Sequence, residues 1–221
     1  MASHLDLEEQ EQLAQLRHFW NTYGNWITWV LIVILGGYAA WNGYQYWQRN
    51  QASKASALYD EVERAVEGKD AVRIERSLAD MKDKFGSTTY AHQAALLAAR
   101  ALYDQDKTDA AKAALQWVVD QASDPVYRDV ARLRLAAVLL DAKAHDPALA
   151  QLQAAFDPSM NALASDLRGD VLMAKGQQTE AVAAYRQAWQ LMDSKTEYRR
   201  LVQAKLNALG VDPERATETA K

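Results

Sequence analysis

The 221-residue sequence predicts an all-α protein in which one N-terminal transmembrane helix precedes a solenoid of helical hairpins. Three observations support this fold class. No charged side chain occurs in residues 19–48, a run of 30. Beyond residue 48, apolar residues recur at spacings of three and four, as on one face of a helix. That region also lacks the alternating apolar pattern of strands and the Asn-Gly or Asp-Gly turns of β-hairpins.

Residues 19–48 have the length and rim chemistry of a membrane anchor. A helix from Trp26 to Trp47 would be about 33 Å long, and a bilayer core is about 30 Å thick. Tryptophan and tyrosine gather at both ends of the apolar run, as at the two membrane interfaces. A cleaved signal peptide fits poorly, because the preceding segment is acidic rather than basic. We therefore expect a short acidic tail over residues 1–18 and a membrane-spanning anchor over residues 19–48.

The basic residues that flank the anchor do not settle its orientation. Arg17 is the single basic side chain near its N-terminal end, whereas Arg49, Lys54 and Arg64 lie near the other end. This count weakly favours a cytoplasmic C-terminal side. Long domains can cross a membrane regardless of flanking charge, so both orientations stay open.

Residues 49–221 form the predicted repeat domain. Breaks separate helical segments of 12 to 18 residues, and several begin with Asp, Ser or Pro, which favour helix starts. An atypical first helix pair is expected over residues 53–85, and a terminal capping helix over residues 196–209, with Gly210 as its stop signal. The breaks are expected at Gly86-Ser87, residues 104–106, Ser123-Asp124-Pro125, His145-Asp146-Pro147, Asp157-Pro158 and Gly176.

One segment, residues 166–189, resembles the tetratricopeptide repeat. Its small residues Gly169, Ala181 and Ala188 have the spacing at which two antiparallel helices touch, Gly176 falls in the turn, and Tyr185 fills the gap to the next unit. The marker alanines 111, 148 and 181 recur at intervals of 37 and 33 residues, near the 34 of that repeat. We predict a tetratricopeptide-like solenoid, with a generic helix bundle as the alternative. The two preceding units match at Ala99, Leu102, Ala111, Leu115 and Val118, and at Ala136, Leu139, Ala148, Leu152 and Ala155.

The sequence offers no recognisable active site. It contains no cysteine, no phosphate-binding glycine loop, no G-x-S-x-G and no HExxH. The net charge of −4 gives no basis for nucleic-acid binding. His4, His18, His92 and His145 show no metal-binding spacing, and we expect His92 to be solvated or capping and His145 to lie exposed in a turn. Asp166 and Asp170 share a helix face that we expect to be solvated, so we predict no enzyme and no cofactor or metal.

Partner binding is the function that remains. Stacked helix pairs form a concave surface lined by the first helix of each pair. The apolar residues among the expected lining have the core as an alternative position, which leaves Arg100, Tyr103 and Asp170 as the stronger candidates. The expected partner-binding groove contains Gln93, Leu96, Arg100, Tyr103, Asp166, Asp170 and Met173, with Val130, Leu133, Ala137, Leu140 and Leu163 beside them.

Anchor and repeats together resemble the YfgM-type ancillary subunit of the bacterial SecYEG translocon. The features that carry the resemblance follow one another along the chain: Glu8-Glu9-Gln10-Glu11, Leu16-Arg17-His18-Phe19-Trp20, Tyr23-Gly24-Asn25, Tyr44-Gln45-Tyr46-Trp47 and Ala55-Ser56-Ala57-Leu58-Tyr59.

The resemblance implies a single-pass protein of the bacterial inner membrane, with a cytoplasmic N-terminus and a periplasmic repeat domain. It implies a non-enzymatic accessory role at the Sec translocon, scaffolding membrane-anchored periplasmic chaperones near exported unfolded proteins. The lipid bilayer is contacted by the anchor. The alternative is a membrane-anchored repeat adaptor of another cell-envelope assembly complex.

Overall fold

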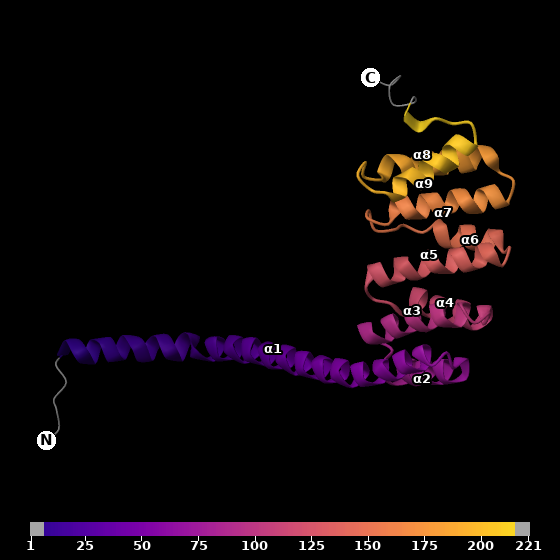
Figure 1. Ribbon diagram of the computed structural model, residues 1–221. Coiled ribbons are helices and arrows are strands. Elements are labelled where there is room, and N and C mark those ends of the chain that lie inside the picture. The colour runs from indigo at the N-terminus through magenta and orange to yellow at the C-terminus, as the bar shows by residue number, and fades with distance from the viewer. Residues whose placement is uncertain (1–6, 215–221) are drawn as a thin grey trace. The chain divides into compact units, whose positions relative to one another are not determined.

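The computed structural model describes residues 7–214, which contain helices and no strand (Figure 1). Residues 1–6 of the predicted tail lie outside this range, and the tail is helical from Leu7 onward. The chain divides after Gln51 into an N-terminal unit and a repeat unit. The helices are α1 (Leu7–Glu67), α2 (Ala71–Phe85), α3 (Thr89–Tyr103), α4 (Thr108–Gln121), α5 (Pro125–Asp141), α6 (His145–Leu152), α7 (Asn161–Ala174), α8 (Gln178–Leu191) and α9 (Tyr198–Ala208).

The N-terminal unit consists of the first part of α1, whose apolar side chains are exposed. Trp26, for example, is 74% exposed. Within residues 7–214, α1 is the one helix long and apolar enough to cross a membrane. Its polar side chains bond to its own backbone: Thr28 Oγ1 donates to the Gly24 carbonyl at 2.7 Å, and Asn42 Nδ2 donates to the Tyr38 carbonyl at 2.9 Å. Since lipid offers no hydrogen bonds, this pairing suits a membrane-spanning segment.

Up to residue 214, the repeat unit is a stack of four helical hairpins and a final single helix. The hairpins are the end of α1 with α2, α3 with α4, α5 with α6, and α7 with α8, and they follow one another in chain order (Figure 1). The structure thus confirms the all-helical solenoid, including an atypical first pair within residues 53–85. It also confirms the terminal helix, which spans Tyr198–Ala208 and stops before Gly210 at φ +76°.

Each hairpin turn contains one residue in the left-handed conformation. These residues are Lys69, Asp106, Lys143 and Gly176, with φ between 51° and 77°. In each turn the left-handed residue donates its N–H to the carbonyl three residues earlier, and the next residue donates to the carbonyl five residues earlier. This pattern satisfies the free carbonyls at the end of a helix and reverses the chain. Repetition of the same turn therefore gives the four hairpins a common geometry, although only the last has the preferred glycine.

Side-chain caps start several of the helices. The carboxylate of Asp70 accepts the Arg73 N–H, the hydroxyl of Thr88 accepts the Ala91 N–H, and the carboxylate of Asp124 accepts the Val126 N–H. Pro125 follows Asp124 in the first turn of α5, where its missing N–H has no helical partner in any case. The predicted break at Ser123-Asp124-Pro125 is confirmed.

The third hairpin differs from the prediction because α6 is short. It begins at His145, so His145, Asp146 and Pro147 form its first turn rather than a break, and His145 is half-buried. It ends at Leu152, which leaves Ala155 outside the helix. The buried carboxylate of Asp129 accepts the Asp157 N–H at 2.8 Å and holds the connecting segment. Pro158 then prevents helical continuation at this point.

Alanine allows the helices of the repeat unit to approach closely. Helix α3 packs against α2, α4 and α5, and side chains are buried around most of its circumference. A small side chain at these positions lets neighbouring backbones meet without voids. The buried alanines of α3 are residues 91, 94, 95, 98 and 99.

Gly169 of α7 lies directly against the ring of Tyr185 of α8. A Cβ built on Gly169 would lie 2.4 Å from the Cε1 atom of Tyr185, so the ring occupies the space of a side chain. Tyr185 also packs in one apolar cluster with Leu206 of α9, as predicted. Leu201 was expected in the same interface, but it is 48% exposed. The buried face of α9 is instead formed by Val202 and Leu206, four residues apart.

Replacing Gly169 with leucine should therefore destabilise the repeat unit. We expect a loss of roughly 1–3 kcal/mol in the free energy of unfolding, because the Tyr185 ring must move away from an overpacked site. The measurement is urea unfolding of a fragment that begins at Asn50. Ala183→Leu on the exposed face of α8 is the control, expected within about 0.5 kcal/mol of wild type. Equal effects of the two substitutions would contradict this packing.

Candidate partner-binding groove

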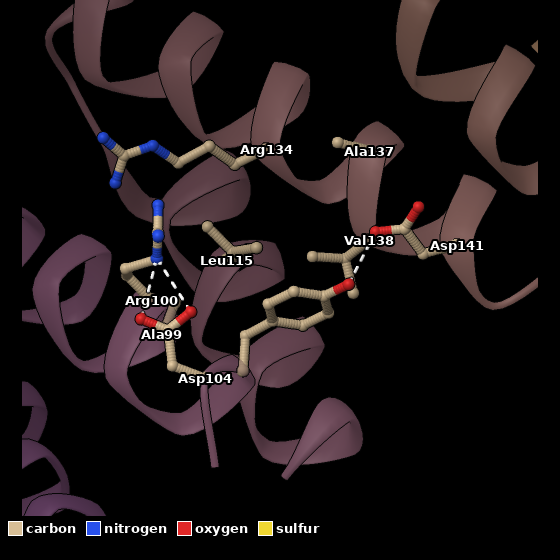
Figure 2. A pocket seen from close by; sticks show the side chains of 9 residues that line it. Ala99, Arg100, Asp104, Leu115, Arg134, Ala137, Val138 and Asp141 are labelled. Atoms are coloured by element: carbon tan, nitrogen blue, oxygen red, sulfur yellow. Dashed lines mark hydrogen bonds and ion pairs between the residues drawn. The ribbon is translucent and has the colours of Figure 1, made fainter. Parts of the chain in front are cut away.

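A pocket of about 340 Å³ opens between α3 and α5, the first helices of two consecutive hairpins (Figure 2). Two of the predicted groove residues, Arg100 and Tyr103, line it, and so does Ala137 beside them. The lining is completed by Ala99, Asp104, Leu115, Arg134, Val138 and Asp141.

One end of this pocket is basic. The Arg100 Nε donates to both carboxylate oxygens of Asp104, at 3.0 and 2.9 Å. Arg134 reaches across from α5 and donates from Nη1 to the Leu96 carbonyl at 3.4 Å, one turn before Arg100 on α3. Among residues 7–214, Arg134 forms no ion pair. Two guanidinium groups therefore share this end with one carboxylate.

The other end is formed by a tyrosine and an acid. The Tyr103 hydroxyl donates to Oδ2 of Asp141 and joins α3 to α5 (Figure 2). This hydrogen bond, with a smaller contribution from burial, raises the pKa of Tyr103, so the hydroxyl stays protonated at neutral pH. The pocket thus has a basic end, an apolar floor and a hydrogen-bonding end.

The remaining predicted residues of α3 and α5 are engaged in packing. Gln93 donates from Nε2 to the Tyr127 hydroxyl at 2.6 Å. Leu96 belongs to the core and is buried, so its expected place on the groove surface is wrong. Its side chain follows the buried stripe of α3. Val130, Leu133 and Leu140 are half-buried against the core clusters.

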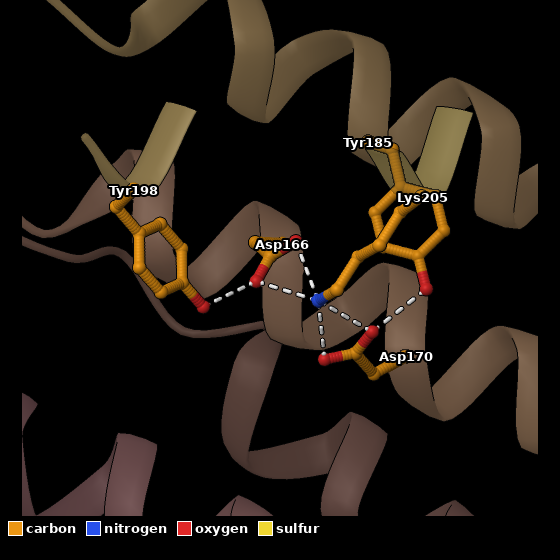
Figure 3. A network of polar contacts seen from close by, with 5 residues as sticks. All are labelled: Asp166, Asp170, Tyr185, Tyr198 and Lys205. Carbon is orange, nitrogen blue, oxygen red and sulfur yellow. Dashed lines mark hydrogen bonds and ion pairs between the residues drawn. The ribbon is translucent and has the colours of Figure 1, made fainter. Parts of the chain in front are cut away.

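The predicted groove residues of α7 lie in a polar network with α8 and α9 (Figure 3). Lys205 Nζ lies 2.9 Å from both carboxylate oxygens of Asp166 and 2.8 Å from Oδ2 of Asp170. The Tyr198 hydroxyl donates to Asp166 and the Tyr185 hydroxyl donates to Asp170, each at 2.7 Å. Asp166 is only 1% exposed.

The expectation of a solvated face at Asp166 and Asp170 is therefore wrong. The terminal helix covers that face and supplies Lys205 as the counter-charge. Burial, followed by the hydrogen bonds to the carboxylates, raises the pKa of both Tyr185 and Tyr198, which keeps both hydroxyls as donors. Met173 is half-buried against the apolar cluster that contains Tyr185 and Leu206, whereas Leu163 is exposed. This network ties α9 to the last hairpin.

Arg134 and Asp141 are charged pocket residues of α5 that sequence reasoning missed, as it also missed Asp104 at the end of α3. Arg134 and Asp141 lie on α5 about one helical turn before and after the predicted residue Ala137. The prediction followed the apolar stripe of α5, and these charged residues border it. Charges that border the stripe on the first helix of a pair are the signal that identifies them.

His92 on α3 is buried, which also differs from the prediction. It is 2% exposed, and its ring lies 5.7 Å from that of Trp117 and 6.3 Å from that of Tyr127. Its Nε2 has no hydrogen-bond partner within the described range. Burial lowers the pKa of His92, which favours the neutral form of the imidazole in the fold. The expected solvated position is wrong, because the aromatic rings of α4 and α5 cover the start of α3. A backbone hydrogen bond to Gly86, the residue that ends α2, agrees with the capping role.

We expect this burial to make stability pH-dependent. An unfolded histidine takes up a proton near pH 6.5, whereas folded His92 resists it, so unfolding binds a proton below that pH. The stability gained from unprotonated His92 is fully present above pH 6.5. Below pH 6.5 the free energy of unfolding should fall by up to about 1.4 kcal/mol per pH unit. Urea unfolding of the fragment from Asn50 between pH 7 and 5 measures the slope. His92→Gln should flatten it, whereas His145→Gln should not; an unchanged slope in His92→Gln contradicts this assignment.

Known proteins resemble this chain over nearly its whole length. A family model described as a tetratricopeptide repeat-like domain matches residues 17–211. A Neisseria gonorrhoeae protein named ancillary SecYEG translocon subunit is 33% identical over 95% of this chain and 100% of its own. Proteins of the same name from Haemophilus influenzae and Escherichia coli are 30% and 29% identical, each over 92% of this chain and 98% and 97% of their own. Within residues 7–214, no group of three or more acidic or histidine side chains could hold a metal ion.

Proposed function

This chain belongs to the tetratricopeptide repeat-like family of ancillary SecYEG translocon subunits, and from this premise we propose that it is a membrane-anchored accessory subunit of the Sec translocon. Its role is non-catalytic. The repeat unit faces the periplasm and docks partner polypeptides, among them membrane-anchored chaperones that receive exported chains. The observation that carries the proposal is the similarity over the full length of the relatives, which includes both the apolar helix and the repeats.

The apolar first part of α1 supports an anchored role. Its exposed tryptophans and aliphatic side chains are costly in water and favourable in lipid. The α3–α5 pocket supports a docking role, because stacked helix pairs present such concave surfaces to partners.

Copurification tests the assignment to the translocon. The full-length chain, tagged and extracted in mild detergent, is expected to retain translocon subunits. A fragment from Asn50, which lacks the apolar helix, is the matched control and should lose them if the anchor makes the contact. Recovery of a different envelope assembly complex, with no translocon subunit, would favour the alternative adaptor role and overturn the proposal.

Protease accessibility tests the topology. We expect protease added to spheroplasts to degrade the repeat unit while cytoplasmic markers survive, since the repeat unit is proposed to be periplasmic. Retention of the protein in the membrane pellet after alkaline carbonate tests the anchor independently. A protected repeat unit would reverse the proposed orientation and exclude contact with periplasmic chaperones.

A further inference from the structure

We propose that a polar pocket at the junction of α8 and α9 binds a phosphate group. This pocket has a volume of about 440 Å³ and shares no residue with the α3–α5 pocket. The phosphate belongs to a phospholipid headgroup or to a soluble phosphate ester, two sources that present the same chemistry to the protein. The inference adds a ligand site to the proposed docking function and does not depend on it.

Three cationic side chains line this pocket. Lys195 lies in the connection between α8 and α9, and Arg199 and Arg200 lie in the first turn of α9. Among residues 7–214, none of the three takes part in an ion pair, whereas Lys205 on the same helix is neutralised by two aspartates. An anion in the pocket is therefore attracted by three positive charges at once.

Arg199 is held in place by stacking on Trp189. Its guanidinium carbon lies 3.9 Å from the centre of the Trp189 ring, and its Nε is buried with no hydrogen-bond partner within the described range. A guanidinium stacked by its flat face keeps its N–H groups along its edge, where a phosphate can accept two parallel bonds. Because stacking already orders the side chain, binding costs less conformational entropy than at a mobile arginine.

Neutral donors complete the pocket. Ser194 and Thr196 line it and bring two hydroxyl groups. Asp193 orders this connecting segment, because its carboxylate accepts the Lys195 N–H at 2.8 Å and its carbonyl accepts the Thr196 N–H at 3.1 Å. A phosphate has more acceptor oxygens than a carboxylate, so cationic and hydroxyl donors on several sides of one pocket favour phosphate.

Two carboxylates also line the pocket and give the proposal a test of sign. Glu214 accepts a hydrogen bond from Nε2 of Gln203 at 3.1 Å. Glu197 precedes the first residue of α9, and its side chain does not cap that helix. The charge of Glu197 opposes a bound anion and would favour a bound cation. Removing this charge should therefore strengthen binding only if the ligand is an anion.

Isothermal titration calorimetry with defined anions tests the proposal. The full-length chain is kept in a maltoside detergent, free of phosphate and at constant ionic strength. The probes are glycerol phosphate, a soluble monoester, and glycerophosphoglycerol, the diester headgroup of phosphatidylglycerol; glutarate is the dicarboxylate control. The variants are Arg199→Gln, Arg200→Gln and Glu197→Gln, with Arg76→Gln on the exposed face of α2 as the matched charge control.

We expect glycerol phosphate to bind at least tenfold more tightly than glutarate, because one additional charge-assisted hydrogen bond contributes about that factor. Arg199→Gln and Arg200→Gln should each weaken binding, with about a tenfold loss for Arg199→Gln. Glu197→Gln should strengthen it by about two- to fivefold, as for an exposed charge pair, and Arg76→Gln should leave it unchanged. Tighter binding of the diester would assign the phosphate to a lipid headgroup, and tighter binding of the monoester to a soluble ester.

Glutarate binding as tight as that of glycerol phosphate would overturn the inference, since the pocket would then accept acidic groups in general. Equal effects of Arg199→Gln and Arg76→Gln, weaker binding by Glu197→Gln, or no binding of either ester at millimolar concentration would also overturn it. Circular dichroism verifies that each variant is folded, and Arg200→Gln, at an exposed position, keeps the test valid if Arg199→Gln is not. Retention of translocon subunits is measured separately, so failure of phosphate binding leaves the proposed function standing.

Discussion

Replacing Tyr185 with alanine is expected to lower the free energy of unfolding of the repeat unit by about 3–5 kcal/mol. The ring is buried between α7 and α9, fills the space above Gly169 and packs with Leu206. Its removal leaves a cavity that rigid helices cannot close. Its hydroxyl is also lost as a donor to Asp170.

Urea unfolding of the fragment from Asn50 measures this loss, and two variants separate its causes. Tyr185→Phe keeps the ring and removes only the hydroxyl bond, so about 1 kcal/mol is expected. Leu191→Ala, at the exposed end of the same helix, should cost within about 0.5 kcal/mol. A Tyr185→Ala loss no larger than that of Tyr185→Phe would show that the cavity is not formed and that the α7–α8 packing is different.

The second large effect is expected at Lys205. Lys205→Met removes the cation that neutralises the buried carboxylate of Asp166 and also pairs with Asp170. A buried charge left without its partner typically costs 3–5 kcal/mol. We expect a loss of about 3 kcal/mol, because the side chain of Lys205 is partly exposed and the Tyr198 hydroxyl still donates to Asp166.

A double substitution tests whether the unpaired charge is the cause. Lys205→Met combined with Asp166→Asn should be more stable than Lys205→Met alone, because no uncompensated carboxylate remains at position 166. Lys84→Met, in the exposed pair with Asp80, is the control, with an expected cost below about 1 kcal/mol. If the double variant is less stable than Lys205→Met, the network is held by something other than charge pairing.

Both effects lie where the last hairpin packs against α9, and together they describe how the solenoid ends. The stack must cover the apolar face of its last hairpin, and α9 does this with Val202 and Leu206. Arg199 adds a contact, with its guanidinium carbon 3.9 Å from the ring centre of Trp189. The same helix supplies the cation for Asp166 and Asp170. Loss of either interaction should therefore loosen the terminal helix before the earlier hairpins.

The sequence alone determined the elements of this fold, because they depend on local physics. The uncharged run with aromatic rims, the Asp124-Pro125 start signal, and the spacing of Gly169, Gly176 and Tyr185 act within one helix or one turn. The left-handed turns at Asp106 and Lys143 gave no such signal, since neither residue is a glycine. Their conformation is imposed by the helices on either side.

Tertiary structure decided which polar residues are free and which are held. Asp166 and Asp170 share a face in any register of α7, but whether that face meets water depends on α9, more than 30 residues later. His92 is buried by rings from α4 and α5, and Arg134 and Arg100 line one pocket only because α3 and α5 stack. Helical periodicity fixes the direction of a side chain on its own helix. It carries no information about which other helix lies opposite, and charge pairing and burial are set by that partner.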